Sequence, residues 1–297
     1  MSATLPAALE GERVEFDSSA GRLSVYRSGS GPPLLLIHSI NAAASAAEMR
    51  PLYDRYRATR TVFAIDLPGF GFSERSDRVY SPRLMTDAIH AIAQRIQKEC
   101  GANPVDACAL SLSCEFLVRA AVETPSAFRT LALVSPTGFS GTRSRRAPPG
   151  TTYAMPWLYR SLRGPGWGRS LFGALTRPAV IRYFLRRTWG AKSIDDRLWH
   201  YDVLSARQTG AEHAPLYFLS AGLFSADIHT LYDQLSQPVW LSHGVRGDFT
   251  DYRGTSMLAG RTNWRISVFP TGALPHFEVL NEFAADYDRF LLETAPR

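Results

Sequence analysis

The chain has 297 residues, of which 45% are hydrophobic and 20% charged, and its formal net charge is +6. This balance is typical of a globular protein and excludes a disordered or fibrous one. The basic residues are spread over many segments without a pure basic run, so we expect no nucleic-acid partner. The longest apolar runs, such as 34–37, fall far short of the roughly 20 residues that cross a bilayer, so we expect no membrane span.

Targeting and metal-binding signals are absent from the sequence. Residues 1–13 lack the basic start, apolar block and cleavage site of a signal peptide, which favours a cytoplasmic location. Cys100, Cys108 and Cys114 are odd in number and lack CxxC spacing, which argues against disulfides and a zinc site and favours buried thiols. The histidines show no HExxH spacing. We therefore predict no metal and no cofactor.

Apolar runs alternate with helical periodicity in the first half of the chain. Strands are expected at 22–26, 34–38, 61–65, 105–110 and 130–134, and helices at 43–56, 82–100 and 114–123. The alternation is typical of the α/β class. It predicts a mostly parallel central sheet with helices on both faces.

The composition changes after Pro136, where Gly, Pro and Arg become frequent and no strand is indicated until 238–242. We interpret residues 1–136 and 237–297 as one core and 137–236 as an inserted, mainly helical cap. The aromatic residues of the insert favour a cap that lines an apolar pocket, although most of them must also pack the cap. Among them are Trp157, Trp167, Tyr183 and Phe184. A strand at 265–269 and a helix at 281–293 close the chain.

Ala109-Leu110-Ser111-Leu112-Ser113 lies between a predicted buried strand and a predicted helix. This is where a G-x-S-x-G nucleophile elbow belongs, a sharp turn that presents a serine hydroxyl. Here small Ala109 and Ser113 replace the two glycines. A serine at a helix start is also a common N-cap, so the motif alone does not decide between the two roles.

A nucleophilic serine needs a base and a carboxylate that orients the base, and on such a fold they follow in the order Ser, Asp or Glu, His. His276 follows the last predicted strand, and Asp248 follows the strand before it. Asp251 is the alternative acid, or a helix cap for a segment that starts near Tyr252. We predict Ser111, Asp248 and His276 as a catalytic triad.

Taken together, these segments resemble the α/β-hydrolase superfamily over nearly the whole chain. The segments are His38-Ser39-Ile40 after a strand, Asp66-Leu67-Pro68-Gly69-Phe70-Gly71-Phe72-Ser73, the elbow, Asp248 and His276. The resemblance implies an α/β-hydrolase fold, with a mostly parallel sheet, flanking helices and the inserted cap, and a serine esterase-like activity.

The resemblance also implies a mechanism. Ser111 attacks an acyl carbonyl, His276 accepts and returns the proton, and Asp248 holds the imidazolium. The backbone N–H groups of Ile40 and Leu112 would form the oxyanion hole. The family usually has His-Gly where this chain has His38-Ser39, so Ser39 either donates through its hydroxyl or serves as a turn residue. His38, Ser39 and Asp251 are further candidates for contacts with the substrate or the triad.

The expected reaction is hydrolysis of a carboxylic ester of a small hydrophobic substrate (EC 3.1) through an acyl-enzyme at Ser111. Thioesterase, lactonase and carbon–carbon hydrolase activities on the same triad stay open. Haloalkane dehalogenases and epoxide hydrolases use an aspartate nucleophile, which Ser111 excludes. A second class is a non-catalytic, hydrolase-like binding protein. Arginines beside aromatics in the insert also suggest nucleic acid, but a basic cap that attracts acidic substrates is the better interpretation.

Overall fold

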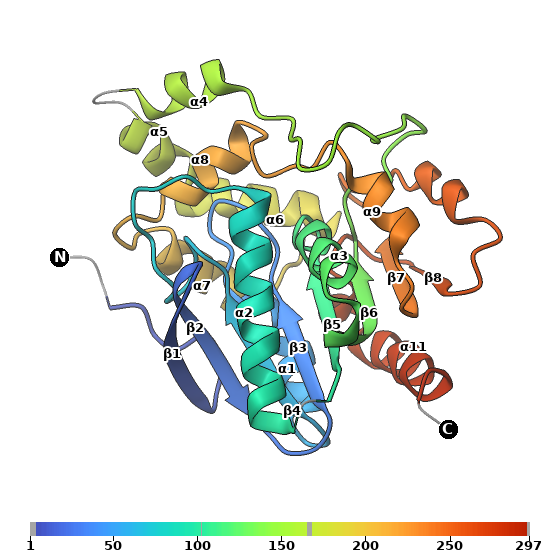
Figure 1. Ribbon diagram of the computed structural model, residues 1–297. Helices are drawn as coiled ribbons and strands as arrows, with labels where there is room; N and C mark the ends of the chain where they lie inside the picture. The colour runs from blue at the N-terminus through green and yellow to red at the C-terminus, as the bar shows by residue number, and fades with distance from the viewer. Residues whose placement is uncertain (1–3, 102, 165–167, 296–297) are drawn as a thin grey trace.

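The computed structural model describes residues 4–101, 103–164 and 168–295. Its strands form one eight-stranded sheet in the order β1-β2-β4-β3-β5-β6-β7-β8 (Figure 1). Strands β3 to β8 run parallel, whereas β1 and β2 pair in antiparallel fashion at one edge. The strands are β1 (Glu12–Ser18), β2 (Gly21–Ser28), β3 (Pro33–Ile37), β4 (Thr61–Asp66), β5 (Val105–Leu110), β6 (Phe128–Val134), β7 (Val239–Gly244) and β8 (Trp264–Phe269).

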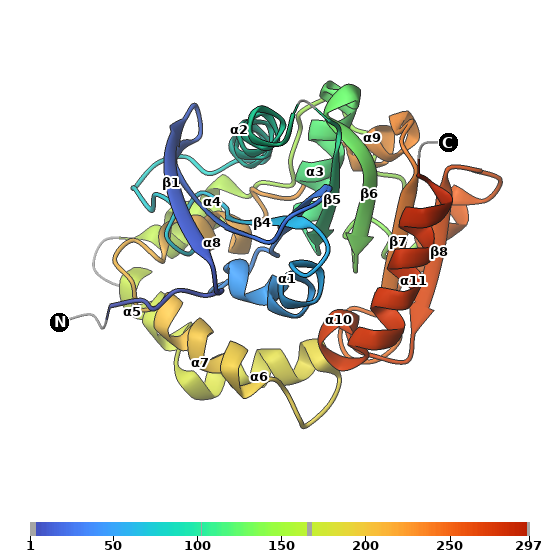
Figure 2. The same cartoon turned by 90° about the horizontal axis from the view of Figure 1, so that it is seen from below.

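Helices cover both faces of the sheet. One face carries α2 (Pro82–Cys100) and α3 (Ser113–Glu123), and the other carries α1 (Arg50–Tyr56) and α11 (Leu280–Glu293) (Figure 2). Successive strand side chains point to opposite faces, so Leu35 belongs to one apolar layer and Leu34 and Leu36 to the other. Burial on both faces explains the continuous apolar runs of the sequence. The predicted α/β class with a mostly parallel sheet is confirmed.

The predicted core elements match the observed ones closely, with two exceptions. Helix α2 and strand β5 begin and end at the predicted residues. The predicted helix 43–56 is instead a short 3-10 helix, η1 (Ala46–Met49), followed by α1, because the Ser45 side chain caps η1 at Ala47. Strand β1 was not predicted, since in this mostly exposed edge strand only Val14 and Phe16 are apolar.

Between β6 and β7 lies the segment 137–236, which we call the cap segment. Its described residues form helices and, besides them, one isolated bridge between Thr152 and Ser225. The helices are α4 (Pro156–Arg163), α5 (Gly168–Leu175), α6 (Pro178–Trp189), α7 (Asp196–Ser205), α8 (His213–Leu219) and α9 (Ile228–Gln234). A buried ion pair of 2.8 Å between Arg119 of α3 and Asp227 ties the segment to the core. None of the helices in the described ranges is long and apolar enough to cross a bilayer.

Several cap aromatics face solvent rather than an enclosed pocket. Trp157, Tyr183 and Phe184 are 62%, 52% and 53% exposed. Trp167 lies outside the described residues. Phe172 and Trp189 are buried, so only part of the aromatic content packs the cap against its surroundings.

The loop after β4 is built around the buried carboxylate of Asp66. Its two oxygens accept hydrogen bonds of 2.9 Å from the backbone N–H groups of Ala46 and Phe72. Gly71 has a φ of +50°, and a Cβ at this position would overlap the Asp66 carboxylate. The second glycine of the D-x-P-G-x-G segment is therefore required both by its backbone conformation and by space.

We expect Gly71→Ala to lower the free energy of unfolding by about 3 kcal/mol, since it combines left-handed strain with an overlap in a packed interior. Gly141→Ala is the matched control, because Gly141 has a φ of +67° and nothing within 4 Å of its Cβ position. The control should lose about 1 kcal/mol or less. Urea unfolding measures both values, and equal losses would show that the overlap at Asp66 has no energetic weight.

Candidate functional site

Five of the parallel strands, β3 and β5 to β8, bring polar residues to one edge of the sheet. In the register of β5 and β6, Leu110 pairs with Val134, so Ser111 and Ser135 follow at the same edge. In the register of β3 and β5, Ile37 pairs with Ala109, which places His38 one strand away. The loops after β7 and β8, which carry Asp248 and His276, leave from this same C-terminal edge because the strands run parallel.

Ser111 has the backbone of a sharp strand-to-helix turn. It is one of three non-glycine residues with positive φ in the described chain, at +56°, and its N–H donates to Val134 O at 2.8 Å. A serine in this left-handed region costs roughly 1 kcal/mol or more, so the surrounding structure must impose the conformation. The partly exposed Ser111 hydroxyl and the N–H groups of Leu112 and Ile40 form no hydrogen bond with any other described residue. These three groups are therefore unpaired in the described structure.

Glu48 of η1 holds the loop that contains Ile40. Its carboxylate accepts hydrogen bonds from Ser39 N at 2.7 Å, from Ser39 Oγ at 3.0 Å and from Asn41 Nδ2 at 2.6 Å. Burial raises the pKa of Glu48, and these donors oppose the shift. The Ser39 hydroxyl is therefore engaged with Glu48. The sequence did not point to Glu48, because a carboxylate at the start of a helix carries no signal of a contact nine residues back.

His38 also holds this loop through contacts of both its ring nitrogens. Its Nε2 accepts a hydrogen bond of 2.9 Å from Leu67 N, and its Nδ1 lies 2.6 Å from Ser39 O. Burial lowers the pKa of His38 to about 4, so the ring is neutral near pH 7. Nδ1 therefore carries the proton and donates a hydrogen bond to Ser39 O. These contacts are those of a positioning residue rather than of a group that meets a substrate.

His276 is fully buried beneath η1. Its Nε2 donates to Glu48 O at 2.9 Å, and its Nδ1 has no partner among the described residues. The rings of Phe277 and Phe283 lie 5.0 and 5.9 Å from its own. Burial lowers the pKa of His276 to about 4, and the hydrogen bond to Glu48 acts in the opposite direction. The imidazole is therefore a neutral group locked to a backbone carbonyl.

The two candidate acids are bound to arginines. The Asp248 carboxylate accepts hydrogen bonds from Arg187 Nε at 2.5 Å and Nη2 at 2.8 Å, and both side chains are exposed. Asp251 accepts from Gly141 N at 2.9 Å and from Arg253, including its backbone N–H at 3.2 Å. Asp251 thus contacts the first residue of η3 (Arg253–Leu258), whereas the N-cap position of η3 is Tyr252, which makes no side-chain cap hydrogen bond. No hydrogen bond joins Ser111, Asp248 and His276 to one another in the described structure.

The last turn of α6 lies between the loops that carry the candidate acid and base. Arg187 O accepts from Asp248 N at 3.2 Å, and Thr188 O accepts from Ala273 N at 2.9 Å. The Ser135 hydroxyl in turn donates to Ala273 O at 2.7 Å. The residue of the last loop that reaches the strand edge beside Ser111 is thus Ala273, three positions before His276.

A pair of stacked rings, which the sequence did not reveal, lies beside Ser135. The ring of Tyr252 stacks on His243, with the ring centroids 3.9 Å apart. Burial raises the pKa of Tyr252, and a hydrogen bond to Ser135 partly offsets this rise.

Cys108 and Cys114 are buried, as predicted, and Cys114 Sγ donates to Ala109 O. Burial raises the pKa of Cys114 well above its ordinary value, so the thiol is an inert packing group.

Comparisons with known proteins are consistent with the mostly parallel sheet and its flanking helices. A sequence model of the alpha/beta hydrolase family matches residues 34–286. No curated protein matches the chain in a sequence search. Among solved structures, a thermophilic esterase from Thermogutta terrifontis is similar with a TM-score of 0.72 and 16% identity, over 96% of this chain and 100% of that one.

Two further similar structures carry other hydrolytic reactions in their names. The enol-lactonase from Burkholderia xenovorans has a TM-score of 0.69 and 13% identity, over 94% of this chain and 100% of that one. The meta-cleavage product hydrolase from Pseudomonas fluorescens has a TM-score of 0.69 and 17% identity, over 95% of this chain and 98% of that one. At such identities the likeness shows the shared fold.

The buried, neutral His276 predicts a pH dependence of stability. Between the unfolded pKa near 6.5 and the folded value of about 4, only the unfolded chain binds the proton, so stability falls as the pH falls. Each such histidine contributes on the order of 1 kcal/mol per pH unit in this window. Urea unfolding at pH 7.5 and 5.0 should show a smaller loss for His276→Gln than for the wild type. The exposed control His200→Gln should keep the wild-type loss, and an unchanged loss in His276→Gln would contradict the prediction.

Proposed function

Because the chain belongs to the α/β-hydrolase family, we propose that it hydrolyses a carboxylic ester or related acyl bond of a small hydrophobic substrate, with Ser111 as nucleophile. One observation carries the proposal: Ser111 holds a φ of +56° at the end of β5, with a hydroxyl that no described residue engages. A strained serine with a free hydroxyl at the C-terminal edge of a parallel sheet has the geometry of a nucleophile elbow.

In the proposed reaction, Ser111 Oγ attacks the acyl carbonyl while His276 accepts the hydroxyl proton. The oxyanion is stabilised by the N–H groups of Ile40 and Leu112, which form no other hydrogen bond in the described chain. His276 returns the proton to the leaving group, and water then hydrolyses the acyl-enzyme. Asp248 orients the imidazole, and the cap segment covers the site.

To form the proposed triad, His276 and Asp248 must each give up its present hydrogen-bond partner. His276 Nε2 must leave Glu48 O, which costs about 1–3 kcal/mol if that buried carbonyl stays unpaired. Asp248 must leave Arg187, and this exchange is easy because the pair is exposed and screened by salt. Burial of His276 also makes it a weak base until a carboxylate reaches it. A substrate that assembles the proposed triad has to displace His276 from Glu48 and Asp248 from Arg187.

A second candidate function is binding without turnover. It is favoured by the contacts of the candidate acid and base, since Asp248 is held by Arg187 and His276 by Glu48. In this case the free Ser111 hydroxyl and the neighbouring N–H groups would hydrogen-bond an acyl carbonyl and leave it intact.

Thioester, lactone and carbon–carbon substrates of the same serine also form part of the test. The similar structures include an enol-lactonase and a meta-cleavage product hydrolase.

We expect the wild type to hydrolyse p-nitrophenyl esters and to react with a fluorophosphonate probe, and Ser111→Ala to lose both, with turnover reduced at least about 1000-fold. Ser242→Ala is the control, because this buried hydroxyl at the end of β7 has no partner in the described structure and should be replaceable. An ester series from acetate to laurate, a thioester and a lactone then rank the substrate classes. A wild type that binds an acyl ligand but shows neither turnover nor labelling would establish the second candidate instead.

Glu48→Gln should lower kcat by about tenfold or more with little change in KM, since the amide NH₂ must face a donor on Ser39 or Asn41 and displaces the loop that carries Ile40. Glu282→Gln, which changes an exposed glutamate of α11, is the control and should keep the wild-type kcat. Steady-state kinetics and the rate of fluorophosphonate labelling measure the effect, with a melting curve for each variant. A folded Glu48→Gln with unchanged kcat would contradict the role of Glu48.

A further inference from the structure

The two outer strands of the sheet differ in how they are protected against pairing with another chain. Among its seven residues β1 carries four charges, Glu12, Arg13, Glu15 and Asp17. Strand β8, at the opposite edge of the sheet, reads Trp-Arg-Ile-Ser-Val-Phe and carries one charge, Arg265. Charged side chains on an outer strand oppose edge-to-edge pairing, whereas an apolar outer strand favours it. Strand β8 is therefore the edge at which a further strand fits.

One face of β8 presents two exposed β-branched side chains. Ile266 is 41% exposed and Val268 is 56% exposed. In the register of β7 and β8 they lie beside Leu241 and His243, which are both buried, so the exposure begins at the last strand. The sheet thus ends in an apolar strip that the described part of the chain leaves uncovered.

The backbone of β8 also has unpaired groups on its outer side. Val239 N donates to Asn263 O at 2.8 Å, so the odd-numbered residues of this segment direct their N–H and C=O groups toward β7. The even-numbered Ile266 and Val268 direct theirs away from the sheet, where no described residue binds them. The two residues that expose apolar side chains therefore also expose free hydrogen-bonding groups.

This strip matches a second copy of itself. When two β8 strands run antiparallel about a twofold axis at Ser267, Ile266 lies opposite the partner's Val268, and Val268 opposite the partner's Ile266. Both pairs join residues whose N–H and C=O groups point outward, as hydrogen-bonded pairs of an antiparallel ladder require. Apolar cross-strand pairs stabilise a sheet, and the twofold axis makes each contact twice.

The charges of α11 fit the same axis. Arg265 and Ser267 of β8 both bind Asp286, so an axis at Ser267 passes close to Asp286. Arg289, exposed one turn after Asp286, then faces the partner's Glu282, exposed one turn before it. Opposite charges thus meet twice across the axis. An extended segment of another protein would have the backbone match without this charge match, which favours a second copy of this chain.

We propose that the chain forms a twofold dimer in which two β8 strands pair antiparallel, so that the two sheets join into one. The apolar strip on one face and the α11 helices on the other both become covered. None of the predicted catalytic residues lies in β8, so the dimer is independent of the proposed hydrolysis at Ser111.

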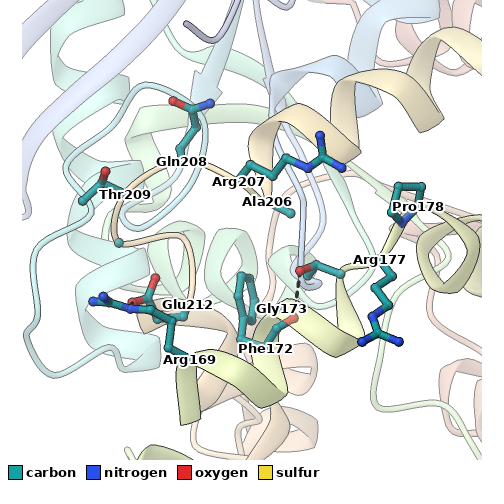
Figure 3. Close-up of a pocket in the computed structure, with 12 residues that line it drawn as sticks. Arg169, Phe172, Gly173, Arg177, Pro178, Ala206, Arg207, Gln208, Thr209 and Glu212 are labelled. Carbon is teal, nitrogen blue, oxygen red and sulfur yellow. Dashed lines mark hydrogen bonds and ion pairs between the residues drawn. The ribbon is translucent and has the colours of Figure 1, made fainter. Parts of the chain in front are cut away.

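Pairing at β8 leaves the cap segment uncovered. A hollow of about 440 Å³ in this segment is lined by α5, the start of α6 and the loop between α7 and α8 (Figure 3). Helices α5 and α7 lie toward the β1 side of the molecule, away from β8 (Figures 1 and 2). The cap segment therefore stays open to solvent in the proposed dimer.

Sedimentation velocity over a range of protein concentrations tests the dimer. We expect the wild type to form a species of twice the mass of the chain. Val268→Lys should weaken the dimer about tenfold or more, because it removes both apolar pairs and adds two cations near the axis. Val79→Lys is the matched control, since Val79 is 70% exposed and lies before α2, outside β8, and it should dimerise like the wild type. A melting curve shows that each variant is folded.

Charge reversal on α11 tests the position of the axis. Arg289→Glu should weaken the dimer by about fivefold, because two like-charged pairs replace two attractive ones, and adding Glu282→Arg should restore the wild-type affinity. A double variant as weak as Arg289→Glu would contradict the axis at Ser267.

Three further outcomes would overturn the dimer itself. A wild type that stays monomeric would leave the edge to a strand of another protein. Folded Val268→Lys that dimerises as tightly as the wild type, or equal weakening by Val79→Lys, would show that the contact does not involve β8. Assemblies larger than two chains would indicate open edge pairing instead of a closed twofold dimer.

Discussion

The buried carboxylate of Asp66 is the contact on which the candidate site depends. One of its oxygens binds the N–H of Ala46, which fixes the start of η1, and the other binds Phe72 in the adjacent loop. Glu48 of η1 then makes contacts through both its side chain and its backbone. The Glu48 side chain holds Ser39 and Asn41 around Ile40, and its backbone carbonyl holds His276. A single desolvated carboxylate thereby sets the position of both the predicted oxyanion loop and the predicted base.

Burial shifts the pKa values of Glu48 and His276 in opposite directions. Burial raises the pKa of Glu48 and lowers that of His276, so each favours the neutral form of its own side chain. Glu48 has three hydrogen-bond donors that stabilise its anion, whereas His276 has one acceptor on Nε2 and an unpaired Nδ1. The polar cluster is therefore complete around Glu48 and incomplete around His276.

The sequence predicted the order of core elements because hydrophobic periodicity is local. The helix 82–100 and the strand 105–110 each carry their own signal and were placed to the residue. Strand β1 carries almost none, because its residues are mostly exposed at the sheet edge. The sharp turn at Ser111, with its φ of +56°, could be predicted because it depends on a local motif. The partners of Asp248 and His276 could not, since Arg187 and Glu48 lie 61 and 228 residues away and no pattern within one segment records them.

The attachment of α6 has a mechanical consequence. Its last turn is joined to the loops after β7 and β8 through peptide groups, Arg187 O to Asp248 N and Thr188 O to Ala273 N. Bonds between backbones do not require particular side chains, so substitutions at these positions other than proline at Asp248 or Ala273 keep the donors and acceptors. Helix α4, in contrast, has no buried residue. The cap segment is thus fixed at α6 through its backbone, whereas α4 is held by side chains, such as the Arg163–Asp77 ion pair of 2.6 Å, so substitutions change the attachment of α4 more readily than that of α6.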